Sequence, residues 1–211
     1  MTAALAAILN PVRTLIRFVL WTWFLAALAA GRFGLLQTLP APALSGLLLG
    51  LTALVLGACF GIPSVRAWLR TVDLRVLILL HVSRLIAYAF LIFFRRGWLP
   101  DALAVPGGWG EVLVGALALA IVVLPMRAPL QRHAFVIWNT IGLFNVLLLS
   151  ATFVRLGFVQ PWQITGFRLL PCSMFPTFLI PLIIATHLVI YDLSRVPPGT
   201  PDGPAAPPAE A

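Results

Sequence analysis

LILLHVSRLIAYAFLIFF, residues 77–94, places a histidine and an arginine inside an otherwise apolar run. A helix that crosses a bilayer needs about 20 mostly apolar residues, and this run with its flanks is long enough. Arg84 lies about 13 Å along such a helix from Arg75, which marks the expected membrane boundary. A charged side chain at that depth costs at least ~2.5 kcal/mol. The stretch therefore predicts a transmembrane helix whose polar side chains face protein or trapped water.

The composition of the whole chain agrees with a membrane protein. The 211 residues are 61% hydrophobic and only 9% charged, with a mean hydropathy of +1.04, whereas soluble domains are about 25% charged. The formal net charge of +8 comes from 14 arginines and no lysine. Most of these arginines stand at the ends of apolar runs, where membrane proteins use them as topology determinants. We therefore expect a lipid bilayer as the partner and no nucleic acid.

Six apolar segments are long enough to span a membrane, which predicts an all-α transmembrane bundle over residues 14–195. The expected spans are about 14–31, 42–61, 75–94, 109–126, 134–154 and 169–191. Asn10 and Pro11 predict that residues 1–13 form a separate interfacial segment. Residues 196–211 are rich in Pro, Ala and Gly, which predicts a disordered tail. The first apolar run also resembles a signal peptide, but Trp21 and Trp23 in its core favour an uncleaved helix.

The arginines also predict an orientation. With both termini in the cytoplasm, eight arginines lie inside and five lie outside, and arginine-rich loops favour the cytoplasmic side. The inside set is Arg13, Arg17, Arg66, Arg70, Arg75, Arg127, Arg132 and Arg195, and the outside set is Arg32, Arg95, Arg96, Arg155 and Arg168. This usage suggests the inner membrane of a bacterium. Cys59 and Cys172 then lie near opposite faces, too far apart for a disulfide.

Two of the spans carry patterns that bear on packing. The last contains Pro171, Pro176 and Pro181, and proline in a helix frees carbonyl groups and bends the axis, so we expect a kinked last helix. The kink either lines a crevice or serves packing alone. The second span carries small residues at the spacing that lets helix backbones approach closely, within the chain or in a homo-oligomer. The glycines concerned are Gly46, Gly50 and Gly57.

Polar side chains on several spans are predicted to meet at one depth. In an α-helix His81, Arg84 and Tyr88 share one face, because residues three and four apart are neighbours. Asn139, Asn145 and His187 reach a matching depth on the fifth and sixth spans. We predict a ligand-binding layer formed by these six residues and Glu111, although histidine and asparagine inside membranes also serve as hydrogen-bonded packing residues. No metal site is predicted, since neither a CxxC pair nor a Cys/His cluster is present.

Glu111 is the acidic residue best placed to neutralise Arg84, and the sequence leaves two interpretations of it. In the first, the segment before Glu111, WLPDALAVPGGWGE, dips into the membrane as a re-entrant loop and lets the two charges meet. In the second, Glu111 sits in the first turn of a helix that follows a glycine break, where a carboxylate favours the helix dipole. If Glu111 does not reach Arg84, a bound anion is the expected partner.

Four motifs give the chain a family resemblance. They are H-x-x-R at His81–Arg84, P-x-G-x-G-[DE]-x-x-V-G at Pro106–Gly115, W-N-x-x-G-x-x-[ND] at Trp138–Asn145, and L-P-x-x-x-x-P-T-F-x-x-P-x-x-x-x-x-H at Leu170–His187. Together they resemble a widespread uncharacterised family of small polytopic bacterial membrane proteins, over about residues 77–191. The resemblance implies a shared membrane fold and carries no information about chemistry.

Three functions are compatible with these patterns. The first is binding or transport of a small anionic or polar solute, held by Arg84 and served by His81 and His187. The second is a membrane redox protein in which His81 and His187 are the axial ligands of haem b. The third is a non-catalytic assembly or sensor protein whose polar layer only fixes helix register. The chain has no GxSxG, Walker, HExxH or GxGxxG motif, so the sequence favours a protein that is not an enzyme.

Overall fold

The protein is helical throughout the part of the chain that the computed structural model describes, residues 3–125 and 128–195. For residues 3–10, 128, 129, 132 and 195 only the backbone is described. Six of the helical segments are long and apolar enough to cross a membrane. This confirms the predicted all-α bundle with six candidate spans. The predicted tail, residues 196–211, lies outside the described residues.

The elements follow one another in a simple order. They are α1 (Ala3–Arg32), η1 (Leu35–Thr38), α2 (Ala41–Gly61), α3 (Pro63–Leu69), α4 (Leu74–Leu80), η2 (His81–Ala87), α5 (Tyr88–Arg95), α6 (Asp101–Val123), α7 (Ala128–Val159), η3 (Pro161–Arg168), η4 (Phe175–Leu179) and α8 (Ile180–Arg195). The third span is made of α4, η2 and α5 together, and the sixth is made of η4 and α8.

The first helix differs from the sequence-based prediction. It is continuous from Ala3 through Asn10 and Pro11, so the expected break before the first span is absent. Proline removes one hydrogen bond, the one to the carbonyl four residues earlier. A helix in an apolar environment tolerates that loss, because every other conformation leaves more backbone groups unpaired.

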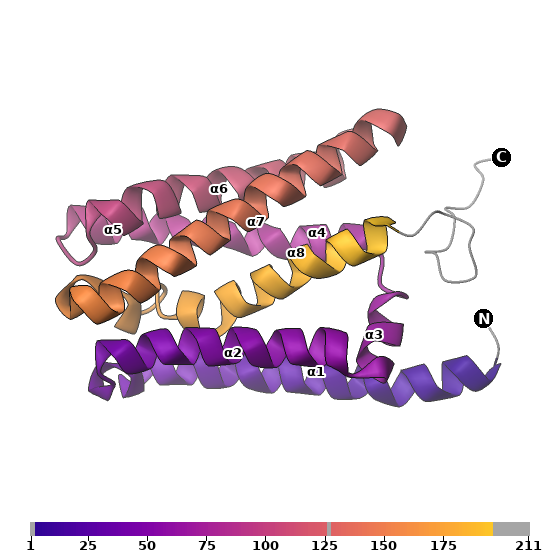
Figure 1. Ribbon diagram of the computed structural model, residues 1–211, viewed down its shortest axis with the longest axis horizontal. Coiled ribbons are helices and arrows are strands. Elements are labelled where there is room, and N and C mark those ends of the chain that lie inside the picture. The colour runs from indigo at the N-terminus through magenta and orange to yellow at the C-terminus, as the bar shows by residue number, and fades with distance from the viewer. Residues whose placement is uncertain (1–2, 126–127, 196–211) are drawn as a thin grey trace.

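The sixth span is the centre of the bundle. Figure 1 shows α8 between α1 and α2 on one side and α6 and α7 on the other. In its apolar window 72% of residues are buried inside the protein, against 11% for the first span. Because the number of spans is even, the start of α1 and the end of α8 lie at the same end of the bundle (Figure 1). The side of the membrane on which that end lies remains a prediction.

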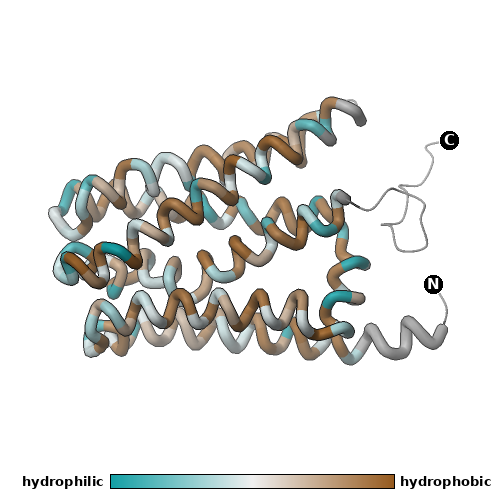
Figure 2. Tube along the Cα trace, in the orientation of Figure 1, coloured by the Kyte–Doolittle hydropathy of each residue, from teal (hydrophilic) through white to brown (hydrophobic). Residues whose placement is uncertain are grey.

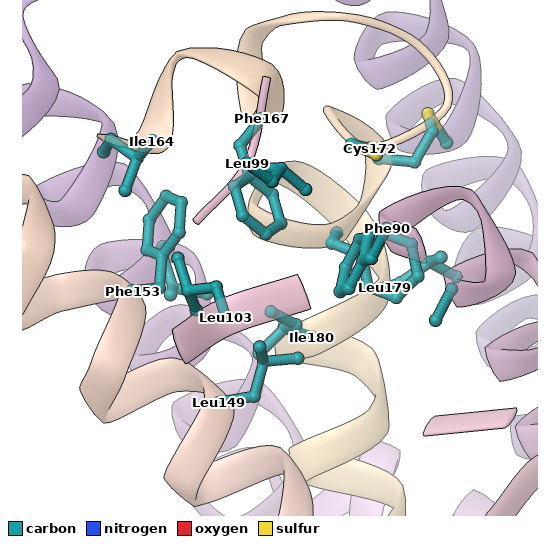
Figure 3. Packing of buried hydrophobic residues seen from close by; sticks show 14 of the residues in the cluster. Phe90, Leu99, Leu103, Leu149, Phe153, Ile164, Phe167, Cys172, Leu179 and Ile180 are labelled. Atoms are coloured by element: carbon teal, nitrogen blue, oxygen red, sulfur yellow. The ribbon is translucent and has the colours of Figure 1, made fainter. Parts of the chain in front are cut away.

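Two apolar clusters fill the bundle at different depths. The larger one lies toward the α5–α6 and α7–η3 turns and includes Phe90, Leu103, Phe153, Phe167 and Ile180 (Figure 3). The smaller one lies toward the other end and is formed by residues of α4, α6, α7 and α8, among them Ile78, Trp138 and Ile190. Figure 2 shows hydrophobic residues along most of each long helix and hydrophilic ones mainly near the ends.

Helix α6 begins earlier than the sequence predicted. It starts at Asp101 and runs through Pro106, Gly107 and Gly108, so these residues form neither a loop nor a re-entrant segment. The glycines are contact points between helices: a Cβ atom on Gly107 would lie 2.8 Å from Leu149, and one on Gly108 would lie 2.9 Å from Leu91. Small residues at such positions let helix axes approach closely.

The last span is irregular where its prolines stand. Residues Phe175–Leu179 form a π-helix before α8 begins at Ile180, and π-helical turns and prolines are the usual causes of kinks. Pro181 has no N–H to offer the carbonyl of Thr177, four residues earlier. The indole nitrogen of Trp23 in α1 donates to that carbonyl oxygen instead, at 2.8 Å. The kink in the sixth span thus provides an attachment point for the first.

The small residues of α2 face away from the rest of the chain. A Cβ atom added to Gly46, Gly50 or Gly57 would meet no atom within 4 Å. A tight contact within the chain, one of the two alternatives drawn from the sequence, is therefore absent, and the homo-oligomer remains a prediction. Both Cys59 and Cys172 are free thiols.

Candidate functional site

Arg84 is placed by a short change in helix type. Residues His81–Ala87 form a 3₁₀-helix, η2, in which side chains three residues apart eclipse one another. His81, Arg84 and Ala87 are accordingly all fully buried. Tyr88, which an α-helix would place on the same face, is 51% exposed. The predicted membership of Tyr88 in the polar layer is therefore wrong, because the turn beneath it is tighter than an α-helical turn.

Arg84 and Glu111 form a buried ion pair. Nη2 of Arg84 lies 2.7 Å from Oε1 of Glu111, and Nε lies 2.8 Å from Oε2, with both side chains 0% exposed. Bidentate pairs of this kind are the strongest charge-assisted hydrogen bonds that arginine makes. Of the two interpretations of Glu111, the structure confirms the ion pair. It does so without a re-entrant loop, because α6 starts at Asp101 and puts Glu111 near the middle of the bundle rather than in a first turn.

The remaining N–H groups of Arg84 also have partners within the chain. Nη1 lies 2.9 Å from Nε2 of His187 and 3.3 Å from the carbonyl oxygen of Gly142, and Nη2 lies 3.2 Å from the same oxygen. A guanidinium group has five N–H donors and no acceptor. All five donors of Arg84 thus point at acceptors of the protein itself, on three different spans.

The contacts of His187 fix its tautomer. Since Arg84 can only donate, Nε2 of His187 must accept, which makes the ring neutral with its proton on Nδ1. That nitrogen lies 2.8 Å from Oδ1 of Asn139, which accepts the proton. The amide nitrogen of Asn139 then donates to the backbone oxygen of His187, at 3.1 Å. Every polar atom of the His187 side chain is therefore paired.

Asn145 completes the environment of Glu111. Its amide nitrogen donates to Oε1 of Glu111 at 2.7 Å, so that oxygen accepts from two different spans. We call Arg84, Glu111, Asn139, Asn145 and His187, with the carbonyl oxygen of Gly142, the polar cluster. It joins the third, fourth, fifth and sixth spans and lies between the two apolar clusters.

His81 lies beside the polar cluster and is less completely paired. Its Nε2 is 3.2 Å from the hydroxyl of Thr186, which itself donates to the carbonyl of Leu182 at 2.9 Å. The ring packs edge-on against Trp138, with centroids 5.0 Å apart, and at 4.2 Å from the ring of His187. Its Nδ1 is buried without a hydrogen-bond partner among the described residues.

The sequence analysis missed two participants. Thr186 was not considered because threonine in a membrane helix usually bonds its own backbone, as this one also does. Its position next to His187 in the motif ending the family resemblance was the available signal. Gly142 acts through its carbonyl, which sequence does not distinguish, but a Cβ atom there would lie 2.6 Å from Cε1 of His187. Glycine at this position is what permits the close approach.

The geometry of the two histidines does not fit a bis-histidine haem site. A porphyrin ring with axial ligands lies between two imidazoles, and these rings are only 4.2 Å apart, centroid to centroid. Both nitrogens of His187 are also engaged, by Arg84 and by Asn139. Within residues 3–125 and 128–195, no three side chains of His, Cys, Asp or Glu are grouped as metal ligands would be.

The comparisons with known proteins identify a family but no activity. The family described as "Domain of unknown function (DUF8737)" matches residues 41–193, which include spans two to six and the whole polar cluster. The match covers well over half of the chain, and the chain therefore belongs to this family. No curated protein and no solved structure matches it.

Proposed function

We propose that this member of the DUF8737 family is a non-catalytic integral membrane protein in which the polar cluster fixes how four spans pack. One observation carries the proposal: every N–H donor of Arg84 is directed at an acceptor of the chain, and the charge of Arg84 is balanced by Glu111. A guanidinium in this arrangement has neither a donor nor an unbalanced charge left for an anion. We place the protein in a bacterial inner membrane with both termini cytoplasmic, as the arginine distribution suggests.

The energetics explain how such a cluster specifies packing rather than adding stability. Removing two charges from water costs several kcal/mol per ion, and their attraction returns this only when the geometry is good. Any shift of one span by a single residue would separate Arg84 from Glu111 and leave both charges unpaired in an apolar medium. The cluster thus penalises wrong registers of the four spans more than it stabilises the correct one.

A second candidate is binding of a small anionic or polar solute at the same place. The observation that favours it is Nδ1 of His81, a buried polar atom without a hydrogen-bond partner in the described chain. A solute that used Arg84 would first have to displace Glu111 or the carbonyl oxygen of Gly142. This candidate therefore requires that the polar cluster opens to water, which the first candidate does not.

The test measures the free energy of unfolding in mixed micelles for Arg84→Met, Glu111→Leu and the double variant. Each single change leaves one buried charge unpaired and is expected to cost about 3–5 kcal/mol. The double variant removes both charges, so its loss should be smaller than the sum of the two. It will not reach zero, because Gly142 and His187 also lose their donor. Arg66→Met is the control: it breaks the exposed pair with Asp192 and should cost at most about 1 kcal/mol.

A labelling experiment separates the two candidates. In a variant without Cys59 and Cys172, Asn145→Cys places a thiol beside Glu111, where a membrane-impermeant maleimide can test access from water. Protection in the bilayer, together with the non-additive stabilities, supports the packing function. Rapid labelling of folded protein would contradict it and favour the solute candidate. Equal stability of both single variants and wild type would contradict it as well.

A further inference from the structure

A groove lies beside the polar cluster, on the end of the bundle that holds the start of α1 and the end of α8. It has a volume of about 430 Å³ and is lined by Phe60, Leu143, Leu188, Tyr191 and Asp192. These residues come from α2, α7 and α8, and Figure 1 shows α7 diverging from α2 toward this end, with α8 between them. The volume is within the range of small-molecule sites, about 300–1,000 Å³.

The inner part of the groove is apolar and lies at the depth of the hydrocarbon. Leu143 is about 15 Å into the fifth span from His133, at about 1.5 Å per residue. On the same helix Ile141 and Phe144 are exposed, and exposed apolar side chains of a membrane span face acyl chains. Phe60, on the second span, is 38% exposed at the groove. The groove therefore opens sideways to lipid, and its walls suit a hydrocarbon chain.

The mouth of the groove is polar and carries both signs of charge. Asp192 lies two residues before the end of the sixth span, at headgroup depth. Its Oδ1 is 3.3 Å from Nη2 of Arg66, and the two side chains are 32% and 45% exposed. The Tyr191 hydroxyl is hydrogen-bonded to Thr140. A carboxylate and a guanidinium side by side match a headgroup that carries an ammonium and a phosphate.

We infer that the groove binds a zwitterionic phospholipid with a primary ammonium headgroup. One acyl chain lies against Phe60, Leu143 and Leu188, the ammonium group meets Asp192, and the phosphate meets Arg66. An anionic lipid without an ammonium would leave Asp192 facing like charge. The inference does not rest on the proposed packing function, because no residue of the polar cluster lines the groove.

The test is a lipid titration of the purified protein, followed by native mass spectrometry, with phosphatidylethanolamine and phosphatidylglycerol as probes. Wild type should bind one phosphatidylethanolamine more tightly than phosphatidylglycerol. Asp192→Asn should weaken phosphatidylethanolamine binding about tenfold, the equivalent of one charge-assisted hydrogen bond, and leave phosphatidylglycerol binding unchanged. Asp101→Asn, at the other end of the bundle, is the control and should change neither.

A second variant tests the apolar part of the groove. Leu143→Trp fills the groove and should abolish the preferential binding, whereas Leu148→Trp adds the same side chain at an exposed position of α7 and should not. Equal affinity of Asp192→Asn and wild type for phosphatidylethanolamine would overturn the inference. Two chains that associate through the groove, seen as a dimer that Leu143→Trp dissociates, would overturn it in favour of a second copy. These readouts are independent of the unfolding measurements on Arg84 and Glu111, so the two proposals fail separately.

Discussion

The indole N–H of Trp23 donates a 2.8 Å hydrogen bond to the carbonyl oxygen of Thr177, the group that Pro181 leaves without its usual helical donor. Trp23 also packs edge-on against Phe178, with ring centroids 4.8 Å apart. This contact attaches a first span that is otherwise little buried. We predict that Trp23→Phe keeps the ring contact, loses the hydrogen bond and lowers the free energy of unfolding by about 1 kcal/mol.

The matched control for this variant is Trp21→Phe. Trp21 lies two residues earlier on the same helix and is 65% exposed, so its replacement should leave stability within about 0.5 kcal/mol of wild type. Equal losses in the two variants would show that the hydrogen bond to Thr177 contributes nothing. Limited proteolysis of the turn between α1 and α2 provides a second readout, because a detached first span exposes that turn.

Gly142 and Gly50 should respond oppositely to the same substitution. A methyl group on Gly142 would meet Cε1 of His187 at 2.6 Å and Cγ1 of Val114 at 2.9 Å, so Gly142→Ala must push α7 away from α8 and cost about 1–3 kcal/mol. A methyl group on Gly50 meets nothing within 4 Å, so Gly50→Ala should be neutral or slightly stabilising. Denaturation of the two variants side by side checks the prediction, and similar curves would contradict the close approach at Gly142.

The tautomer of His187 can be observed directly. Nitrogen chemical shifts of the imidazole in labelled protein should show Nδ1 protonated and Nε2 unprotonated, because Arg84 can only donate to Nε2. Asn139→Leu removes the acceptor of the Nδ1 proton and should cost about 1–3 kcal/mol, the penalty for an unpaired buried donor. A protonated Nε2 in wild type would be incompatible with the Arg84 contact. The shifts of His133, which lies outside the polar cluster, serve as the internal reference.

Self-association through α2 is a separate prediction. Gly46, Gly50 and Gly57 form an outward-facing small-residue surface, and surfaces of this kind let helices of two chains approach closely. Gly50→Leu should therefore abolish a dimer seen by light scattering in mild detergent while leaving the unfolding free energy unchanged. The exposed Leu54 gives the control Leu54→Ala, which should leave the dimer intact. A monomeric wild type at all concentrations would end this prediction.

Much of the fold could be predicted from the sequence, because bilayer thickness and backbone hydrogen bonding leave few choices. The six spans, the irregular last helix and the meeting of Arg84 with His187 all follow from apolar length, proline positions and depth. What failed depended on local geometry. Tyr88 was misplaced because the 3₁₀-helix η2 changes the residue period from 3.6 to 3.0, and nothing in the letters HVSRLIA requires that change.

The start of α6 shows a second limit. Pro106, Gly107 and Gly108 have the composition of a turn, yet they lie inside a helix and bring it against its neighbours. Glycine permits both outcomes, and the choice depends on side chains such as Leu149 and Leu91 that are distant in sequence. For the same reason the pairing of Arg84 with Glu111 could be proposed but not decided, since it depends on where that helix begins.

The ion pair at the centre of the bundle also determines how the protein responds to the electric field of an energised membrane. Moving one elementary charge through 100 mV changes the energy by about 2.3 kcal/mol. Arg84 and Glu111 carry opposite charges within 2.7 Å of each other, so a displacement of the pair as a unit transfers no net charge. A voltage across the membrane therefore exerts almost no force on the buried centre of this protein, although a charge alone at that depth would feel the field.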